Sequence, residues 1–123
     1  MVNRTSRGAL AYQAGQSAEL RVALEYESRG YVIAHRRWRG AGGEIDLIAR
    51  NDDGLVFVEV KKSSGFDTAA ARISQRQINR ICDSAAQFLE RETMGQLTDV
   101  RFDAALVNSV GQIKIIENAF GQA

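Results

Sequence analysis

The 123-residue sequence contains no proline, one cysteine and one histidine. A single cysteine cannot form a disulfide within the chain, and a histidine without partners of its kind supports neither a histidine zinc site nor a serine-type catalytic triad. No apolar run approaches the length of a membrane span, and no apolar segment follows the arginines near the start, so we expect a cytoplasmic protein with no membrane partner.

The charges nearly balance, with a formal net charge of +1. This value does not indicate nucleic-acid binding, so any such activity must come from local clusters of basic side chains. The length suits one domain with a hydrophobic core, and no repeat or low-complexity linker divides the chain. We predict one domain over residues 15–120, preceded by a polar segment, residues 1–14, that could be flexible.

Two strand-like runs, residues 44–50 and 55–61, flank the turn-forming sequence Asn-Asp-Asp-Gly at residues 51–54. This arrangement predicts a β-hairpin around which the rest of the chain is organised. By alternation we expect Ile45, Leu47, Ala49, Val56, Val58 and Val60 on one face, and Ile48, Leu55 and Phe57 on the other.

The turn also sets the register of the hairpin. Whether it closes on its two central residues or on all four, Asp46 stands opposite Glu59, and Glu44 stands opposite Lys61. A one-step slip would place Asp46 opposite Lys61 instead. In either register Asp46, Glu59 and Lys61 share one face, because side chains alternate along a strand.

Carboxylates inside apolar strands lose hydration, so they must pair with a cation or become protonated. Opposed residues have Cβ atoms about 4.5–5.5 Å apart, which would let Asp46 and Glu59 share one divalent metal ion. The alternative is an internal ion-pair network, in which Lys61 neutralises Glu59 and an arginine neutralises Asp46. The spacing leaves both interpretations open.

Residues 15–29 predict a helix that ends at Gly30. Glu19 falls in the middle of the apolar sector of this helix, which places an acid on the buried side. The simpler interpretation is a border residue that reaches solvent or pairs with Arg37 or Arg39.

Residues 31–35 predict a short strand, followed by Arg36-Arg37-Trp38-Arg39 and a loop at residues 40–43. Arginines interleaved with an aromatic side chain can bind phosphates and stack on a base or sugar, which makes this the best candidate nucleic-acid patch. The alternative is a solvated edge strand whose tryptophan anchors the sheet to a helix.

Downstream we expect a loop over residues 62–71, a helix from Ser74 to about Glu92 with a capping box at Ser74 and Gln77, and strands over residues 100–108 and 112–118. Arg76 points away from the apolar stripe of this helix, where it could contact a phosphate or simply be solvated. The order of one helix, three strands, one helix and two strands predicts a single α/β domain with a mixed central β-sheet flanked by helices.

Asp103 alternates with apolar residues on its predicted strand, which indicates a second semi-buried acid. We expect a basic group other than Arg101 to pair with it, because we interpret the geometry between these near neighbours as unsuitable.

Four motifs stand out: Gly43-Glu44-Ile45-Asp46-Leu47-Ile48, Phe57-Val58-Glu59-Val60-Lys61, Arg101-Phe102-Asp103 and Asn118-Ala119-Phe120. Together they resemble the YraN-like family of small bacterial proteins in the PD-(D/E)XK nuclease superfamily, similar in fold to archaeal Holliday-junction resolvases. The likeness runs from residue 15 to residue 120. It implies a restriction-endonuclease-like αβββαβ core.

The resemblance also implies roles for site residues. Asp46, Glu59 and the Val60 carbonyl would bind Mg²⁺ or Mn²⁺, with Glu19 as a third acid nearby and Lys61 beside the attacked phosphate. Hard oxygen ligands suit Mg²⁺, and a bound metal activates water for attack on a phosphodiester. We therefore predict a metal-dependent endonuclease acting on structured DNA, and a homodimer if the likeness to resolvases extends that far.

Six side chains are expected to contact nucleic acid, DNA more than RNA: Arg36, Arg37, Trp38, Arg39, Lys62 and Arg76. Gln77 stands where many relatives carry a lysine, and Lys62-Ser63 lacks the second basic residue that is common two positions after the lysine matched by Lys61. Two other functions remain open. One is a nucleic-acid-binding module without turnover, and the other is a structural protein that assembles through its sheet edge.

Overall fold

The computed structural model describes the backbone of residues 7–71 and 73–120, and the side chains in those ranges except at residues 7–17, 71 and 96. The elements in chain order are α1 (Arg7–Ser28), β1 (Val32–Gly40), β2 (Gly43–Asn51), β3 (Gly54–Lys62), α2 (Phe66–Ala71), α3 (Gln75–Leu89), a short 3₁₀ helix (Gly95–Leu97), β4 (Val100–Val107) and β5 (Ile113–Ile116).

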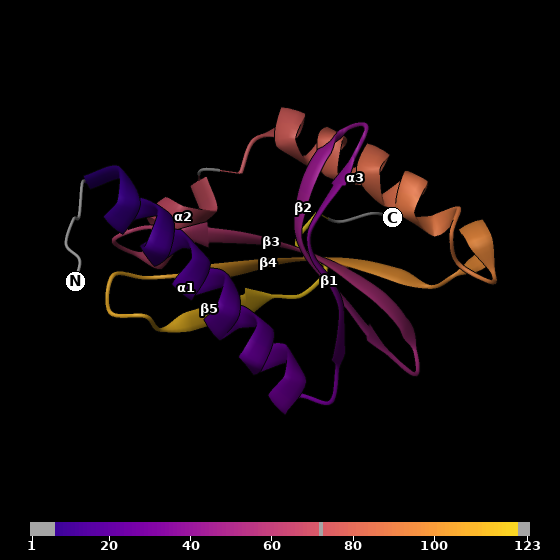
Figure 1. The fold of residues 1–123 in the computed structure, drawn as a ribbon, viewed down its shortest axis with the longest axis horizontal. Helices are drawn as coiled ribbons and strands as arrows, with labels where there is room; N and C mark the ends of the chain where they lie inside the picture. The colour runs from indigo at the N-terminus through magenta and orange to yellow at the C-terminus, as the bar shows by residue number, and fades with distance from the viewer. Residues whose placement is uncertain (1–6, 72, 121–123) are drawn as a thin grey trace.

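The strands form one five-stranded sheet in the order β1-β2-β3-β4-β5. Only β3 and β4 are parallel; the other neighbouring strands are antiparallel. Figure 1 shows α1 running diagonally across the sheet and α3 on its other side. The predicted single α/β domain with a mixed sheet and flanking helices is confirmed.

Two apolar layers hold the helices on the sheet, because strand side chains alternate between the faces. Under α1 lies a buried cluster made up of Ala18, Val22, Ala23, Tyr26, Leu47, Ala49, Val56, Val58, Ala105 and Val107. Under α3 lies a second cluster made up of Ile45, Ile48, Leu55, Phe57, Ile81, Ala85, Phe88, Leu89 and Phe102. The central strands β2 and β3 are therefore covered on both faces.

Ile45 lies on the opposite face from the one that simple alternation predicts. It packs in the α3 cluster, whereas Leu47 packs under α1. The residue ladder from β2 to β3 runs only as far as Leu47 opposite Val58, and beyond it the β1–β2 hairpin curves toward α3 (Figure 1). This bend turns the strand between Ile45 and Leu47, so the alternation restarts there.

The tip of the β1–β2 hairpin lies directly against α3. The Ser84 hydroxyl donates to the Gly43 carbonyl at 2.8 Å, and the Ala41 N–H donates to Gln87 Oε1 at 2.6 Å. A Cβ atom on Gly42 would lie 2.6 Å from the Arg80 carbonyl oxygen. Glycine at this position therefore permits the close approach of the two backbones.

The start of α1 and the end of β1 differ from the predicted boundaries. Helix α1 begins at Arg7 rather than at Gly15, and the residues between include three alanines, a leucine and a glutamine, which favour a helix. Residues 1–6 of the predicted polar segment lie outside the described residues. Strand β1 continues through the arginines, which pair with β2 as far as Gly40 opposite Gly43.

The predicted loop after β3 contains helix α2. Its Ala69 is fully buried against Ala104 and Leu106 of β4. The loop prediction was wrong here, because small residues carry little hydrophobic signal in sequence yet pack closely where two backbones approach.

We expect Gly54→Ala to destabilise the fold by about 2–3 kcal/mol. Gly54 has a φ of +143°, and a Cβ atom there would lie 2.2 Å from the Asp99 carbonyl oxygen, which accepts a hydrogen bond from the Leu55 N–H. Urea denaturation measures the loss. Gly65→Ala is the matched control, because a Cβ atom at Gly65 meets nothing within 4 Å. Equal midpoints for the two variants would contradict the prediction.

Candidate functional site

The site is built on the β2–β3 hairpin, whose predicted register is confirmed. The paired residues run from Asn51 opposite Gly54 to Leu47 opposite Val58. The same register places Asp46 opposite Glu59 at the next position, where β2 begins to leave β3. The two carboxylates therefore meet at the point where the strands separate.

Because β2 and β3 separate here, the Asp46 side chain contacts the backbone of β3. Its Oδ2 atom accepts a hydrogen bond from the Val60 N–H at 2.8 Å, in place of a strand carbonyl. The N–H and C=O of one residue in an antiparallel ladder point toward the same neighbour. The Val60 carbonyl therefore points toward the same gap as the Asp46 side chain.

Glu59 is 5% exposed and is held from two sides. Its Oε2 atom lies 3.2 Å from Lys61 Nζ and also accepts a hydrogen bond from Gln77 Nε2. The Ser74 side chain caps α3 by accepting from the Gln77 N–H, as predicted. The side chain of Gln77 reaches into the site instead of completing a capping box.

The contact of Gln77 with Glu59 was not predicted from the sequence, although the resemblance marks Gln77 as the position where many relatives carry a lysine. The only local signal is a polar residue at the margin of the apolar stripe of α3, next to the cap. Because this contact joins residues on two separate elements, it depends on how α3 lies across β3. The pattern of apolar and polar residues in one helix cannot show how that helix lies on the sheet.

Glu19 of α1 pairs with Arg37 of β1 at 2.8 Å, and the two side chains are 12% and 31% exposed. The interpretation of Glu19 as a border residue paired with an arginine is confirmed. Glu19 also lies near enough to the two hairpin carboxylates for its negative charge to raise the pKa of both. Three acids therefore share one electrostatic environment.

Burial is the largest cause of the raised pKa values of Asp46 and Glu59. It raises the pKa of Asp46 from 3.8 to about 8, and the charge of Glu59 adds to the increase while the Val60 N–H opposes it. Burial also raises the pKa of Glu59, against the attraction of Lys61. The charge of Glu59 disfavours ionisation of Asp46, whereas the hydrogen bond with Asp46 lowers the pKa of Glu59, so the pair retains a proton at neutral pH unless a further cation approaches.

The oxygen atoms at the gap between β2 and β3 suit a hard divalent cation. Two carboxylates and a backbone carbonyl are oxygen ligands of the kind that Mg²⁺ and Mn²⁺ prefer. Among the residues that the structure describes, no group of three or more histidine, cysteine, aspartate and glutamate side chains is arranged to hold a metal ion. A metal here would therefore complete its shell with waters or substrate oxygens, as Mg²⁺ commonly does.

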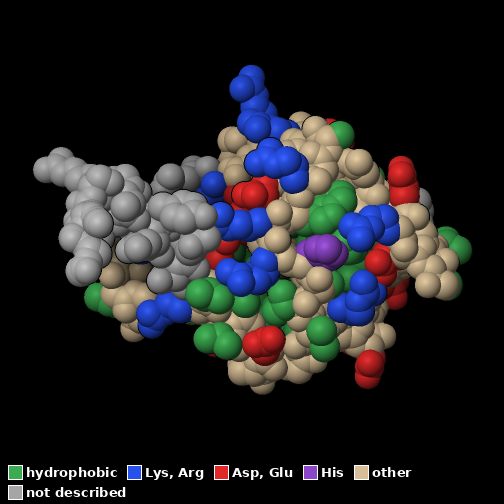
Figure 2. Space-filling model, viewed as in Figure 1, with side chains coloured by type: hydrophobic (Ala, Val, Ile, Leu, Met, Phe, Trp, Pro, Cys, Tyr) green, Lys and Arg blue, Asp and Glu red, His purple; other side chains and the backbone are tan. Residues whose placement is uncertain are grey.

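The residues predicted to contact nucleic acid differ in where they lie and in how exposed they are. Arg36 and Arg39 are exposed on the edge strand β1, Lys62 is exposed at the end of β3, and Arg76 is exposed in the first turn of α3. Arg37 instead turns to Glu19. Figure 2 shows one face of the molecule, on which lysine and arginine side chains gather around acidic ones.

Trp38 packs into the protein rather than standing free on the surface. Its ring meets Phe88 of α3 edge to face at 5.2 Å between centroids, and the Arg91 guanidinium lies 6.0 Å from its centre. This is the sheet-to-helix anchor that the alternative interpretation describes. A contact between Trp38 and nucleic acid stays a prediction.

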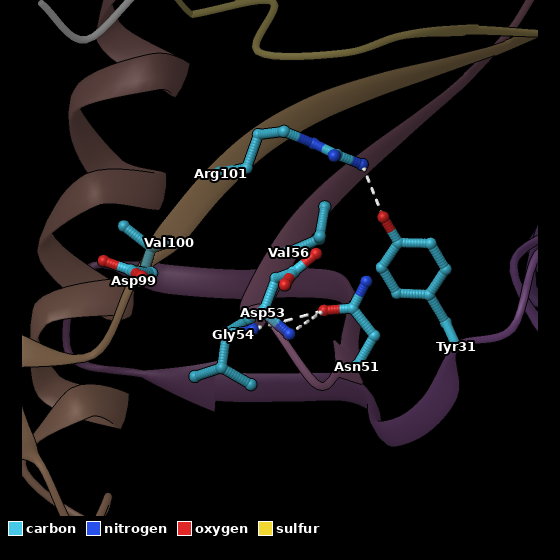
Figure 3. Close-up of a pocket in the computed structure, with 9 residues that line it drawn as sticks. Tyr31, Asn51, Asp53, Gly54, Val56, Asp99, Val100 and Arg101 are labelled. Carbon is cyan, nitrogen blue, oxygen red and sulfur yellow. Dashed lines mark hydrogen bonds between the residues drawn. The ribbon is translucent and has the colours of Figure 1, made fainter.

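A separate pocket of about 260 Å³ lies at the opposite end of β3, shown in Figure 3. Arg101 Nη2 donates to the Tyr31 hydroxyl at 3.0 Å, and Asn51 Oδ1 accepts from the Asp53 and Gly54 N–H groups. Neither Asp46 nor Glu59 lines it. These contacts fix the β2–β3 turn at the far end from the site.

The prediction that Asp103 avoids Arg101 was wrong. Arg101 Nε donates to Asp103 Oδ1 at 2.8 Å, and Arg101 Nη2 donates to Oδ2 at 2.9 Å. Residues two apart on a strand share a face, so a long arginine side chain can fold back onto its neighbour. The Tyr26 hydroxyl and the Asn118 N–H also donate to this carboxylate, at 2.7 Å and 3.0 Å.

The fold and site define an α/β domain with an acidic cluster at the mouth of a central hairpin. Residues 18–107 match the model of an uncharacterised protein family, UPF0102. A UPF0102 protein of Ruegeria pomeroyi is 53% identical over 116 residues that cover 94% of each chain. One of Cereibacter sphaeroides is 54% identical over 113 residues, covering 92% of this chain and 97% of the relative.

A more distant UPF0102 protein, of Dinoroseobacter shibae, is 42% identical over 94% of this chain and 86% of its own. The chain belongs to the UPF0102 family, and the family-level resemblance to YraN-like proteins is confirmed. Within residues 7–71 and 73–120, no helix has the length and apolar character needed to cross a membrane.

Proposed function

We propose that this protein is a metal-dependent endonuclease of the PD-(D/E)XK superfamily that hydrolyses phosphodiester bonds in DNA. One observation carries the proposal: Asp46, Glu59 and Lys61 converge where β2 leaves β3, and burial raises the pKa of both carboxyl groups. The order α1, β1, β2, β3, α3 and β4 follows the αβββαβ core that the sequence resemblance implies, with α2 inserted before α3.

The donors assigned to the metal are Asp46, Glu59 and the Val60 carbonyl. A bound Mg²⁺ or Mn²⁺ would supply an acidified water and charge stabilisation at the phosphate. Gln77 and Lys61 hold one oxygen of Glu59, which fixes the direction of the carboxylate. The Lys61 ammonium would counter negative charge on the attacked phosphate, and Arg37 holds Glu19 at the border of the site.

A second candidate function is a nucleic-acid-binding module without turnover. The observation that favours it is the internal pairing of Glu59 with Lys61 and of Glu19 with Arg37, which compensates two of the three acids without a metal. This module would retain DNA or RNA with a salt-dependent affinity and cut neither.

The test is cleavage of labelled four-way junction, flap, duplex and single-stranded DNA and of an RNA, in Mn²⁺ and in EDTA. We expect Mn²⁺-dependent cutting that Glu59→Gln lowers by at least about 100-fold, because even outer partners of a metal site typically contribute about 10- to 100-fold. Glu27→Gln is the matched control, since Glu27 is exposed on α1.

Each outcome separates the candidates. Cutting by Glu59→Gln at the wild-type rate would contradict the assignment of the site. Binding without cutting by the wild-type protein, in every condition, would replace the nuclease with the binding module.

A further inference from the structure

A second basic cluster lies beside the site, in a pocket of about 230 Å³ that the proposed function does not use. Arg21 of α1, Lys62 at the end of β3 and Ser109 of the β4–β5 turn line it. Lys62 pairs with Val107 in the parallel ladder, so the pocket lies at the end of β3 and β4 where both strands stop.

The pocket lies at the same end of the sheet as the carboxylates, on the face that α1 covers. Lys62 directly follows Lys61, so its side chain leaves β3 on the opposite face from Lys61 and Glu59, on the side of Arg21. In the order of the sheet, β2 and β3 with their carboxylates lie between the arginines of β1 and the β4–β5 turn. An extended polyanion that crosses this end of the sheet from β1 and continues onto the α1 face would therefore reach this pocket.

The turn that lines the pocket is well defined. Asn108 Oδ1 accepts from the Val110 and Gln112 N–H groups, at 3.1 Å and 2.9 Å. The Arg21 guanidinium lies against Gly111, where a Cβ atom would stand 2.9 Å from its Nη1 atom. Glycine at this position therefore lets the guanidinium lie on the turn.

The chemistry of the lining selects an anion. Arg21 and Lys62 bring two positive charges, Ser109 brings a hydroxyl, and no acidic or aromatic side chain is among the described residues that line the pocket. A guanidinium fork matches the oxygens of a phosphate, and a lysine adds a point charge. Without an aromatic ring to stack on a base, the pocket favours a phosphate over a nucleoside.

We propose that this pocket binds a backbone phosphate of the nucleic acid, next to the phosphate that is cut. The inference rests on the proposed function, since the strand must also pass the carboxylates. It assigns a path that runs from Arg36 and Arg39 over Asp46 and Glu59 to Arg21 and Lys62. Contacts of this kind position the strand and carry no sequence preference.

The test measures binding of a labelled DNA by fluorescence anisotropy in Ca²⁺, across a series of KCl concentrations. We expect Arg21→Gln and Lys62→Gln each to weaken binding about five- to tenfold at 0.1 M salt and to reduce the slope of log affinity against log salt by about one. The double variant combines both losses. Cleavage by these variants should show a raised KM with kcat nearly unchanged.

Lys114→Gln is the matched control, because Lys114 is an exposed lysine on β5 outside the pocket. We expect it to bind within about twofold of the wild type with a similar slope. Thermal melting of all variants checks that the fold is kept.

Two outcomes overturn the inference in different ways. A wild-type protein that binds and cuts, with the double variant matching Lys114→Gln, would overturn this inference alone. A wild-type protein that neither binds nor cuts any substrate would overturn the proposed function together with it.

Discussion

Asp46→Asn is expected to make the metal-free protein more stable than the wild type at pH 8, by up to about 5 kcal/mol. The pKa of Asp46 rises from 3.8 to about 8 on folding, chiefly through burial. The folded state therefore binds more protons than the unfolded chain between these values, and stability falls as the pH rises through that window. Asparagine removes the ionisation while its side-chain oxygen can still accept from the Val60 N–H.

The effect has a defined pH dependence, which urea denaturation at several pH values measures. The two proteins should have similar stability at about pH 3 and below, where the acid is largely protonated in both states, and diverge toward pH 8. Asp52→Asn is the matched control, since Asp52 is an exposed residue in the β2–β3 turn. A constant difference across the range would contradict the assignment of the cost to Asp46 ionisation.

Mn²⁺ should narrow the difference in stability between the two proteins. A metal that binds only the folded state adds about 2.7 kcal/mol at 100 times its dissociation constant. We expect Mn²⁺ to raise the melting temperature of the wild type at pH 8 and to leave Asp46→Asn nearly unchanged. Equal shifts in both proteins would show that the ion binds elsewhere.

Asp103→Ala is expected to lose about 3–5 kcal/mol of stability, because it leaves the charge of Arg101 without its buried partner. Asp103 is 0% exposed and accepts four hydrogen bonds: two from Arg101, one from Tyr26 and one from the Asn118 N–H. The substitution removes a link between α1, β4 and the C-terminal segment. The urea midpoint should fall, and hydrogen exchange at the Asn118 amide should accelerate.

Glu117→Gln is the matched control for this network. Glu117 also approaches Arg101, at 3.7 Å, but its side chain is 57% exposed. Water screens such a pair, so we expect a change within about 0.5 kcal/mol. A loss as large as that of Asp103→Ala would mean that the exposed pair, not burial, sets the stability of this region.

The register of the site hairpin could be predicted because turn chemistry and alternation are local properties of the chain. The turn at residues 51–54 sets which residues oppose each other, and this brings Asp46 and Glu59 together. The face of Ile45 could not be predicted in the same way. It depends on a bend that α3 and the close approach at Gly42 impose from outside the strand.

The contacts of Gln77 and Asp103 show two different limits of sequence reasoning. Gln77 reaches Glu59 only because α3 crosses that end of β3. The spacing of apolar residues within the helix does not show where the helix lies on the sheet. Arg101 and Asp103 are near neighbours on one strand, and the rule of alternation already places them on one face. The information was present in the second case and absent in the first.

Helix α3 holds both halves of the acidic cluster at once. Through Gln77 it holds Glu59, and through Ser84 and Gln87 it holds the hairpin tip that continues into Asp46. A small displacement of α3 would carry both carboxylates in the same direction and change their separation little. The distance between the two acids would therefore change little when α3 moves, whereas their position relative to α1 and Glu19 would change.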